Sequence, residues 1–253
     1  RVASRGLGDV YKRQGLGCFY AKKNTSLNVG NSGTLARLLI GILSTTPDIN
    51  IKVTGDSSLN KRNMKELINL MSKFGASFLP KKKYFLPFKI ISSGMPVGID
   101  YKAGESAQLK SAVMFAGLNS YGITTIEEKI KSRDHTENLL IKNTQSIKIK
   151  KGSKKIIKIF GKKNLNPLDI NVGGDPSSAA FFTALTLLNK DSFIKIKNVG
   201  LNPSRTGFYK ILKKQKAKLR FINIKKRNNE ITGDIVVKSC KLKPIKTKAD
   251  MYP

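Results

Sequence analysis

The amino-acid sequence predicts an α/β protein assembled from copies of one strand–helix–strand–helix unit. A short turn rich in glycine and serine occurs three times, at intervals of about 70 residues, and leads each time into an apolar helix. A β-branched strand follows each helix, and an arginine comes about 30 residues after each turn begins. Internal periodicity of this kind indicates a repeated supersecondary unit.

The first turn is Gly30-Asn31-Ser32-Gly33-Thr34, and apolar residues follow it at helical spacing from Leu35 to Ile42. Backbone N–H groups at a helix start are unpaired and point outward, an arrangement that suits an anion. Gly33 lets a ligand approach the main chain, and Arg37 adds a cation one turn into the helix. The same pattern also fits a capped helix packed into a core, so this turn alone leaves both interpretations open.

The two later turns are Gly104-Glu105-Ser106-Ala107-Gln108 and Gly174-Asp175-Pro176-Ser177-Ser178, each followed by an apolar helix. The strands that come next are predicted at Ile49–Val53, Ile123–Ile126 and Phe193–Ile196. The arginines are Arg62, Arg133 and Arg205, and a second amphipathic helix starts after each of them. Three hydroxyl-bearing helix starts with trailing arginines are hard to explain by packing alone, so we predict anion binding.

The remaining segments complete each unit with antiparallel strands. We expect such strands within Ser77–Ile91, Gln145–Phe160 and Leu219–Val237, the last pair being short strands around a turn at Lys226–Asn229. Gly75 is predicted to end the helix Met64–Phe74 as a C-cap. Gly173-Gly174 is the best place for a hinge between two domains.

Composition sets limits on the function. The 253 residues are 40% hydrophobic, enough for one large or two ordinary domains, and no apolar run approaches the roughly 18 residues that span a bilayer. The net charge of +32 favours anionic partners, but the lysines are spread along the chain with few interleaved aromatics, which argues against a nucleic-acid surface. Cys18, Cys240 and His135 lack metal-site spacing, so we expect free thiols, a reducing cytoplasm and no zinc.

Four stretches together resemble the 5-enolpyruvylshikimate-3-phosphate (EPSP) synthase family, from about Gly15 to Val237. They read LNVGNSGTLARLLIG, GESAQLKSAVMFAGLNSYGITTIEEKIKSRDHTENLL, GGDPSSAAFFTALTLL and NVGLNPSRTGFYKIL. The resemblance implies two pseudo-threefold globular domains of βαβαββ units, the enolpyruvyl transferase type of fold. It places two units of the N-terminal domain in residues 15–171 and the first, truncated unit of the C-terminal domain in 172–253. Residues 1–14, RVASRGLGDVYKRQ, resemble translated linker and are expected to be a non-native or disordered leader.

The resemblance also implies a reaction. Enzymes of this family move the enolpyruvyl group of phosphoenolpyruvate onto the 5-hydroxyl of shikimate-3-phosphate and release phosphate, in the shikimate pathway of chorismate and aromatic amino-acid biosynthesis. They need no cofactor, are cytoplasmic and usually monomeric, and bind the inhibitor glyphosate in the phosphoenolpyruvate pocket. No membrane and no specific nucleic acid is expected as a partner.

Site residues follow from matching positions in the family. The resemblance assigns phosphoenolpyruvate to Asn31, Gly33, Arg62 and Gln108, and shikimate-3-phosphate to Ser106, Gln108, Ser132 and Arg133. Arg62 could instead be a surface arginine, and His135 could be structural or touch the substrate. Lys110 could lie near the substrate, but we expect a solvated lysine. Asp175, Ser177, Ser178 and Arg205 are interpreted as hinge and helix-cap residues, although pseudo-symmetry also allows an anion site.

The chain departs from the family pattern at both ends. The N-terminal Lys-Ser…Arg phosphate motif and the later phosphate-binding residues are absent, so we expect an internal fragment that is inactive by itself. The catalytic residue is unknown: Asp250 lies in an Asp-x-x-Pro string that resembles the family's catalytic one but follows Leu242-Lys243 too closely. The alternatives are a UDP-N-acetylglucosamine 1-carboxyvinyltransferase, whose catalytic cysteine loop has no counterpart here, and a basic RNA-binding protein.

Overall fold

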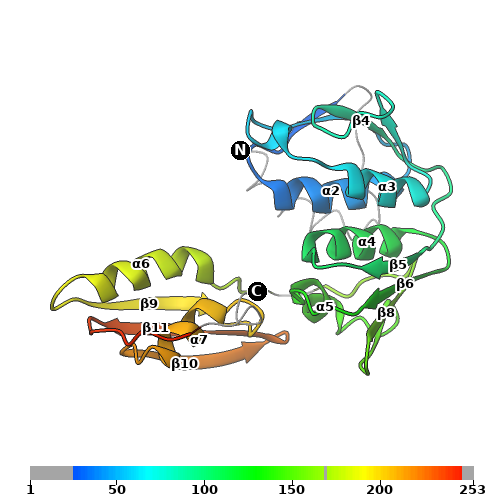
Figure 1. The fold of residues 1–253 in the computed structure, drawn as a ribbon. Helices are drawn as coiled ribbons and strands as arrows, with labels where there is room; N and C mark the ends of the chain where they lie inside the picture. The colour runs from blue at the N-terminus through cyan, green and yellow to red at the C-terminus, as the bar shows by residue number, and fades with distance from the viewer. Residues whose placement is uncertain (1–24, 168–169, 247–253) are drawn as a thin grey trace. The chain divides into compact units, whose positions relative to one another are not determined.

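The computed structural model describes residues 25–167 and 170–246 (Figure 1). The predicted leader 1–14, Cys18 and Asp250 lie outside the described residues. The chain divides into two compact units. The first runs up to Lys131 and resumes over Asn143–Asn166, and the second combines Ser132–Lys142 with the chain from Pro167 onward. No helix in the described part of the chain is both long and apolar enough to cross a membrane.

The first unit contains two copies of the same sheet topology. One sheet has the order β1-β2-β4-β3 and the other the order β5-β6-β8-β7. In each sheet the first two strands are parallel and the other neighbours are antiparallel. The elements of the first copy are β1 (Ser26–Asn28), α2 (Gly33–Thr45), β2 (Asn50–Thr54), the 3₁₀ turn η1 (Leu59–Lys61), α3 (Lys65–Lys73), β3 (Ser77–Leu79) and β4 (Phe88–Ile91). Those of the second are β5 (Asp100–Ala103), α4 (Ala107–Asn119), β6 (Ile123–Glu128), β7 (Ile147–Lys150) and β8 (Lys155–Phe160).

Helices α2 and α4 pack on one another between the two sheets (Figure 1). Their backbones approach closely at Gly41, where an added Cβ would lie 2.6 Å from the carbonyl oxygen of Ala112. The far ends of the two helices are joined by the Asn119 side-chain amide, which donates to the carbonyl oxygen of Thr45 at 2.7 Å. This packing holds the starts of α2 and α4 in a fixed relation to each other.

The second unit repeats part of the topology in a three-stranded sheet of order β10-β11-β9. A single parallel bridge between Gly174 and Val199 stands where the other copies have their first strand. The hydroxyl of the buried Tyr209 donates to the carbonyl oxygen of Pro176 at 2.6 Å and ties α7 to the start of α6. The elements are α5 (His135–Leu140), α6 (Pro176–Leu188), β9 (Phe193–Gly200), α7 (Gly207–Lys214), β10 (Leu219–Arg227) and β11 (Glu230–Lys238).

The three predicted glycine-serine turns all lead into helices, and α2, α4 and α6 each have 13 residues. Gly75 follows α3 with φ +94°, a conformation that favours glycine, which confirms the predicted C-cap. The predicted turn before β11 is also confirmed: Asn228 and Asn229 both have positive φ. The flanking strands β10 and β11 are nine residues each, longer than the short strands that we expected.

Helix α6 differs from α2 and α4 in what covers it. Its side chains Phe181 and Leu188 are 79% and 82% exposed, and Phe182 and Leu185 are more than half exposed. Its opposite face packs on the sheet of the second unit through Ala179 and Leu187. Helix α6 therefore has one buried face and one exposed face, although apolar residues occur on all sides of it.

Candidate anion-binding site

The turn before α2 is held in place by short hydrogen bonds. Ser32 is the N-cap, and its hydroxyl accepts from the Leu35 N–H at 3.1 Å. Gly30 has φ +57°, which permits the turn. The Asn31 side-chain amide donates to the Asp56 carboxylate at 2.5 Å, and the Asp56 N–H donates to the Gly30 carbonyl oxygen at 3.0 Å. These contacts join the turn to the loop after β2.

Two arginine guanidinium groups converge on Gly33. A Cβ added at Gly33 would lie 2.9 Å from Nη1 of Arg62 and 3.2 Å from Nη1 of Arg37. Neither guanidinium forms an ion pair with a carboxylate among the described residues. Desolvation lowers the pKa of Arg37, and repulsion from Arg62 lowers it further. The Asp56 carboxylate interacts at longer range with Arg62, so the two guanidinium groups and the helix start still carry more positive than negative charge, which an anion would neutralise.

Gln108 links the starts of the two packed helices. Ser106 caps α4, accepting from the Leu109 N–H at 3.3 Å, so that Gln108 lies in the first turn. The Oε1 atom of Gln108 accepts from Nη1 of Arg37 at 2.7 Å, and its Nε2 atom donates to the Thr34 hydroxyl at 2.6 Å. The structure thus brings Asn31, Gly33, Arg62 and Gln108, the four residues predicted for phosphoenolpyruvate, to one place in the first unit.

The burial of Lys110 contradicts one expectation from the sequence. We expected a solvated lysine, but its side chain is fully buried and its Nζ lies 2.7 Å from Oε1 of Glu128, itself 1% exposed. The other carboxylate oxygen of Glu128 lies 3.2 Å from Nζ of Lys155. This buried ion pair joins the first turn of α4, two residues after Gln108, to the end of β6.

Ser132 and Arg133, predicted for shikimate-3-phosphate, belong to the second unit. Ser132 is buried. Desolvation and the nearby Arg205 lower the pKa of Arg133, while Asp175 opposes them. Nη2 of Arg205 donates to Asp175 at 2.7 Å and to the Ser177 hydroxyl at 2.8 Å. A carboxylate thus already accompanies the two arginines.

The cap interpretation of Asp175 is confirmed. Its carboxylate accepts from the backbone N–H groups of Ser177 and Ser178 at 3.3 and 3.1 Å, which makes it the N-cap of α6. These hydrogen bonds favour the ionised carboxylate and outweigh its desolvation, so that the pKa of Asp175 is lowered. The carboxylate occupies the helix start that α2 leaves open.

His135 is tied to the β10–β11 hairpin. Its Nδ1 lies 3.0 Å from Oε1 of Glu230, and the same oxygen accepts from the Asn138 side chain at 3.0 Å. Asn202 donates to Asp134 at 3.0 Å. These contacts attach α5, the helix that follows Arg133, to the second unit.

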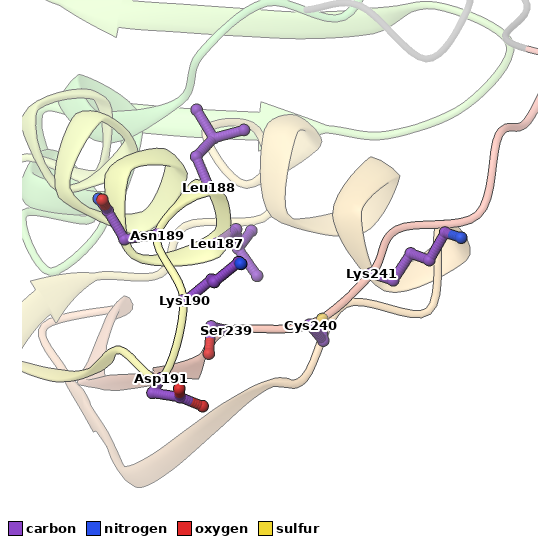
Figure 2. A pocket seen from close by; sticks show the side chains of 8 residues that line it. All are labelled: Leu187, Leu188, Asn189, Lys190, Asp191, Ser239, Cys240 and Lys241. Atoms are coloured by element: carbon purple, nitrogen blue, oxygen red, sulfur yellow. The ribbon is translucent and has the colours of Figure 1, made fainter.

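A separate pocket in the second unit has a cavity volume of about 350 Å³ (Figure 2). It lies at the C-terminal end of α6, lined by Leu188, Lys190, Asp191 and Cys240 among others. Since a 13-residue helix is about 20 Å long, the pocket is far from Asp175 at the helix start. No arginine lines it, and its charged lining residues are Lys190, Lys241 and Asp191, so the pocket lacks the pair of guanidinium groups found at Gly33.

Sequence reasoning identified the residues around Gly33 but not all their partners. Arg37 was recognised as a cation, whereas its hydrogen bond to Gln108 and the role of Thr34 were missed, because the contact joins helices about 70 residues apart. The repeat itself is the signal that could have paired them, since equivalent helices of neighbouring units pack together. Among the described residues no three His, Cys, Asp or Glu side chains gather as a metal site would require.

Comparison with solved structures first defines the fold. The enolpyruvyl transferase NikO from Streptomyces tendae matches with a TM-score of 0.56 at 12% identity, over 81% of this chain and 46% of that chain. The likeness shows that the chain has an enolpyruvyl transferase fold. It confirms the predicted α/β class of repeated units.

The family follows from stronger similarities. The family model described as EPSP synthase (3-phosphoshikimate 1-carboxyvinyltransferase) matches residues 3–252, and the chain belongs to this family. EPSP synthase from Acinetobacter baumannii matches with a TM-score of 0.75 at 35% identity, covering 91% of this chain and 52% of that chain. The 3-phosphoshikimate 1-carboxyvinyltransferase of Petrotoga mobilis is 40% identical over 92% of this chain and 54% of its own length, and that of Acidiphilium cryptum is 36% identical over 100% and 59%. The chain therefore spans somewhat more than half the length of these relatives, and the alternative family of UDP-sugar enolpyruvyl transferases is less supported.

Proposed function

We propose that this chain forms part of an enzyme that transfers the enolpyruvyl group of phosphoenolpyruvate to the 5-hydroxyl of shikimate-3-phosphate. In the net reaction the bond between the enol carbon and the phosphate oxygen breaks, and a new bond forms between that carbon and the 5-oxygen. The hydroxyl proton is released, and phosphate leaves. The relatives named for this reaction and the anion-binding geometry at Gly33 support the proposal.

The observation that carries the proposal is the convergence of Arg37 and Arg62 on Gly33, where neither guanidinium forms an ion pair with a carboxylate among the described residues and only the Asp56 carboxylate interacts at longer range with Arg62. Phosphoenolpyruvate brings a carboxylate and a phosphate, so it supplies the charge that this site lacks. Charge-assisted hydrogen bonds contribute about 1.5–3 kcal/mol each, more than the 0.3–1 kcal/mol of a helix terminus, so the arginines dominate the binding energy. Asn31 shapes the turn, and Gln108 supplies an amide beside it.

The second substrate is assigned to Ser106, Gln108, Ser132 and Arg133. Ser106 and Gln108 open α4, and Arg133 precedes α5. Arg133 supplies the charge for a sugar phosphate. We further propose a cytoplasmic, monomeric enzyme with small-molecule substrates rather than a nucleic acid; tight RNA binding with a steep salt dependence in a filter assay would contradict this.

Isothermal titration of the 253-residue chain with phosphoenolpyruvate tests the proposal. Arg62→Gln should weaken binding about 10- to 100-fold, because it removes one charge-assisted contact. Arg220→Gln is the matched control: it removes the same charge from an exposed arginine on β10 and should leave the affinity unchanged. Equal affinity of wild type and Arg62→Gln would refute the assignment, as would the absence of any phosphoenolpyruvate binding.

The complete reaction is tested separately. Because the chain spans 54% and 59% of two relatives, we expect it to bind phosphoenolpyruvate but to release no phosphate when shikimate-3-phosphate is added. Phosphate release by the purified 253-residue chain would show that the residues needed for catalysis are all present in it.

A further inference from the structure

We propose that the Thr34 hydroxyl is an additional ligand of the bound anion and that Arg37 is the positioning residue that turns it, acting through Gln108. This inference rests on the proposed function, because the ligand is the phosphorylated carboxylate assigned above. It adds one binding residue and one positioning residue to the site.

The first step is the orientation of the Gln108 amide. A guanidinium carries only donors, so the atom of Gln108 that lies 2.7 Å from Nη1 of Arg37 must be the amide oxygen. The amide nitrogen is then turned toward Thr34, whose hydroxyl oxygen lies 2.6 Å away. Arg37 thereby selects one of the two orientations that the Gln108 amide could take.

The second step is the orientation of the Thr34 hydroxyl. Because its oxygen accepts from Gln108, its single proton must point elsewhere. No acceptor for this proton is found among the described residues, and Thr34 is exposed. In a chain of hydrogen bonds each donor polarises the next, so a hydroxyl that accepts from an amide becomes a better donor to an anion.

The third step is the position of Thr34 next to the two guanidinium groups. Thr34 is the second residue of α2 and directly follows Gly33, beside which both guanidiniums lie. A series of contacts of 3.4, 2.7 and 2.6 Å therefore connects the Gly33 carbonyl oxygen, Arg37, Gln108 and the Thr34 hydroxyl. A ligand oxygen at the start of α2 would meet the arginines and this hydroxyl together.

Arg37 also has properties that packing alone does not require. It is half-buried, and within the described chain its guanidinium donates to the carbonyl oxygen of Gly33 and the amide oxygen of Gln108, both neutral. Removing a cation partly from water costs free energy when its hydrogen-bond acceptors are neutral, unless a negative charge is supplied. A bound anion would supply it.

Titration calorimetry of phosphoenolpyruvate against the 253-residue chain tests the inference. Thr34→Val, which keeps the shape and removes the hydroxyl, should weaken binding about tenfold, whereas Thr34→Ser should bind nearly as wild type. Ser57→Ala is the control, since it removes an exposed hydroxyl from the turn after β2. Thr34→Ala provides a second deletion of the hydroxyl, and thermal unfolding of each variant verifies that it is folded.

A double-mutant cycle then separates positioning from mere structural support. In an Arg37→Met background the Gln108 amide is no longer oriented. Adding Thr34→Val to that background should therefore weaken phosphoenolpyruvate binding by less than about threefold. Arg37→Lys keeps a donor-only cation and should restore part of the coupling. If wild type binds phosphoenolpyruvate while Thr34→Val and Thr34→Ala bind equally well, or if the effects of Thr34→Val and Arg37→Met are additive, the inference is wrong and the proposed function stands. If wild type does not bind, both fall.

Discussion

Replacing Gly33 by alanine should separate ligand binding from stability. The added Cβ would lie 2.9 Å from Nη1 of Arg62, and ordinary contacts begin near 3.4 Å, so the guanidinium must retreat by about 0.5 Å. The atoms that must move are the ends of two flexible arginine side chains, whereas a Leu59 methyl at 3.6 Å would be in ordinary contact and can stay in place. Gly33 begins α2 without a positive φ, so alanine is compatible with its backbone.

The expected result is a folded protein with a displaced cation. Alanine is preferred to glycine in helices by up to about 1 kcal/mol, so the midpoint of thermal unfolding should stay constant or rise. Displacing one charge-assisted contact should weaken phosphoenolpyruvate binding about 10- to 100-fold, measured by calorimetry. If glyphosate occupies the same pocket, as the family resemblance leads us to expect, its binding should weaken in parallel.

Gly41→Ala is the matched comparison. There the added Cβ meets backbone atoms of Ala112 at 2.6–3.0 Å, which cannot move aside, so we expect a loss of about 1–3 kcal/mol in the free energy of unfolding. The reasoning is refuted if Gly33→Ala keeps wild-type affinity, or if it lowers the thermal midpoint as much as Gly41→Ala does.

Three further changes test the energetics of the fold. Lys110→Met should lower the free energy of unfolding by about 3 kcal/mol in urea titrations, because it leaves the buried Glu128 without its nearest cation; a loss below about 1 kcal/mol would mean that Lys155 alone compensates the carboxylate. Hydrogen bonds from the Asn198 N–H and the Asn223 side chain, with Lys195 nearby, lower the pKa of Asp234 to about 2, so its contribution to stability is present above pH 4 and is lost as the pH falls toward 2. The thermal midpoint of Asp234→Asn should therefore fall less than that of wild type over this interval, and parallel curves would contradict the assignment. Phe181→Asp should reduce the binding of a hydrophobic dye without lowering the thermal midpoint, since this side chain is 79% exposed; a fall in the midpoint would show that the α6 surface is buried in solution.

The repeated pattern made most of the fold predictable. Apolar periodicity and glycine turns located α2, α4 and α6, and β-branched runs located the strands that follow them. Two features could not be predicted in this way. The burial of Lys110 depends on Glu128, which lies on a strand in the same unit and gives no local signal on α4. The exposure of Phe181 and Leu188 depends on which element packs on α6, whereas the sequence of that helix is apolar on every side.

The three helix starts also show why the same turn does not define the same site. The N-caps of α2 and α4 are serines, which satisfy one backbone N–H and bring no charge, so a ligand must supply the anion. The N-cap of α6 is Asp175, whose carboxylate binds two backbone N–H groups and pairs with Arg205 at 2.7 Å. The third copy thus contains its own anion at the helix start, whereas in the first copy neither arginine forms an ion pair with a carboxylate among the described residues. Asp175→Asn should therefore free Arg205 and strengthen the binding of inorganic phosphate to the second unit. The corresponding change at α2 is Ser32→Asp, which should place a carboxylate beside Arg62 and Arg37. It should abolish phosphoenolpyruvate binding without unfolding the helix. Calorimetry on the two variants measures both effects; an unchanged affinity in Ser32→Asp would show that the charge at the start of α2 does not determine what binds there.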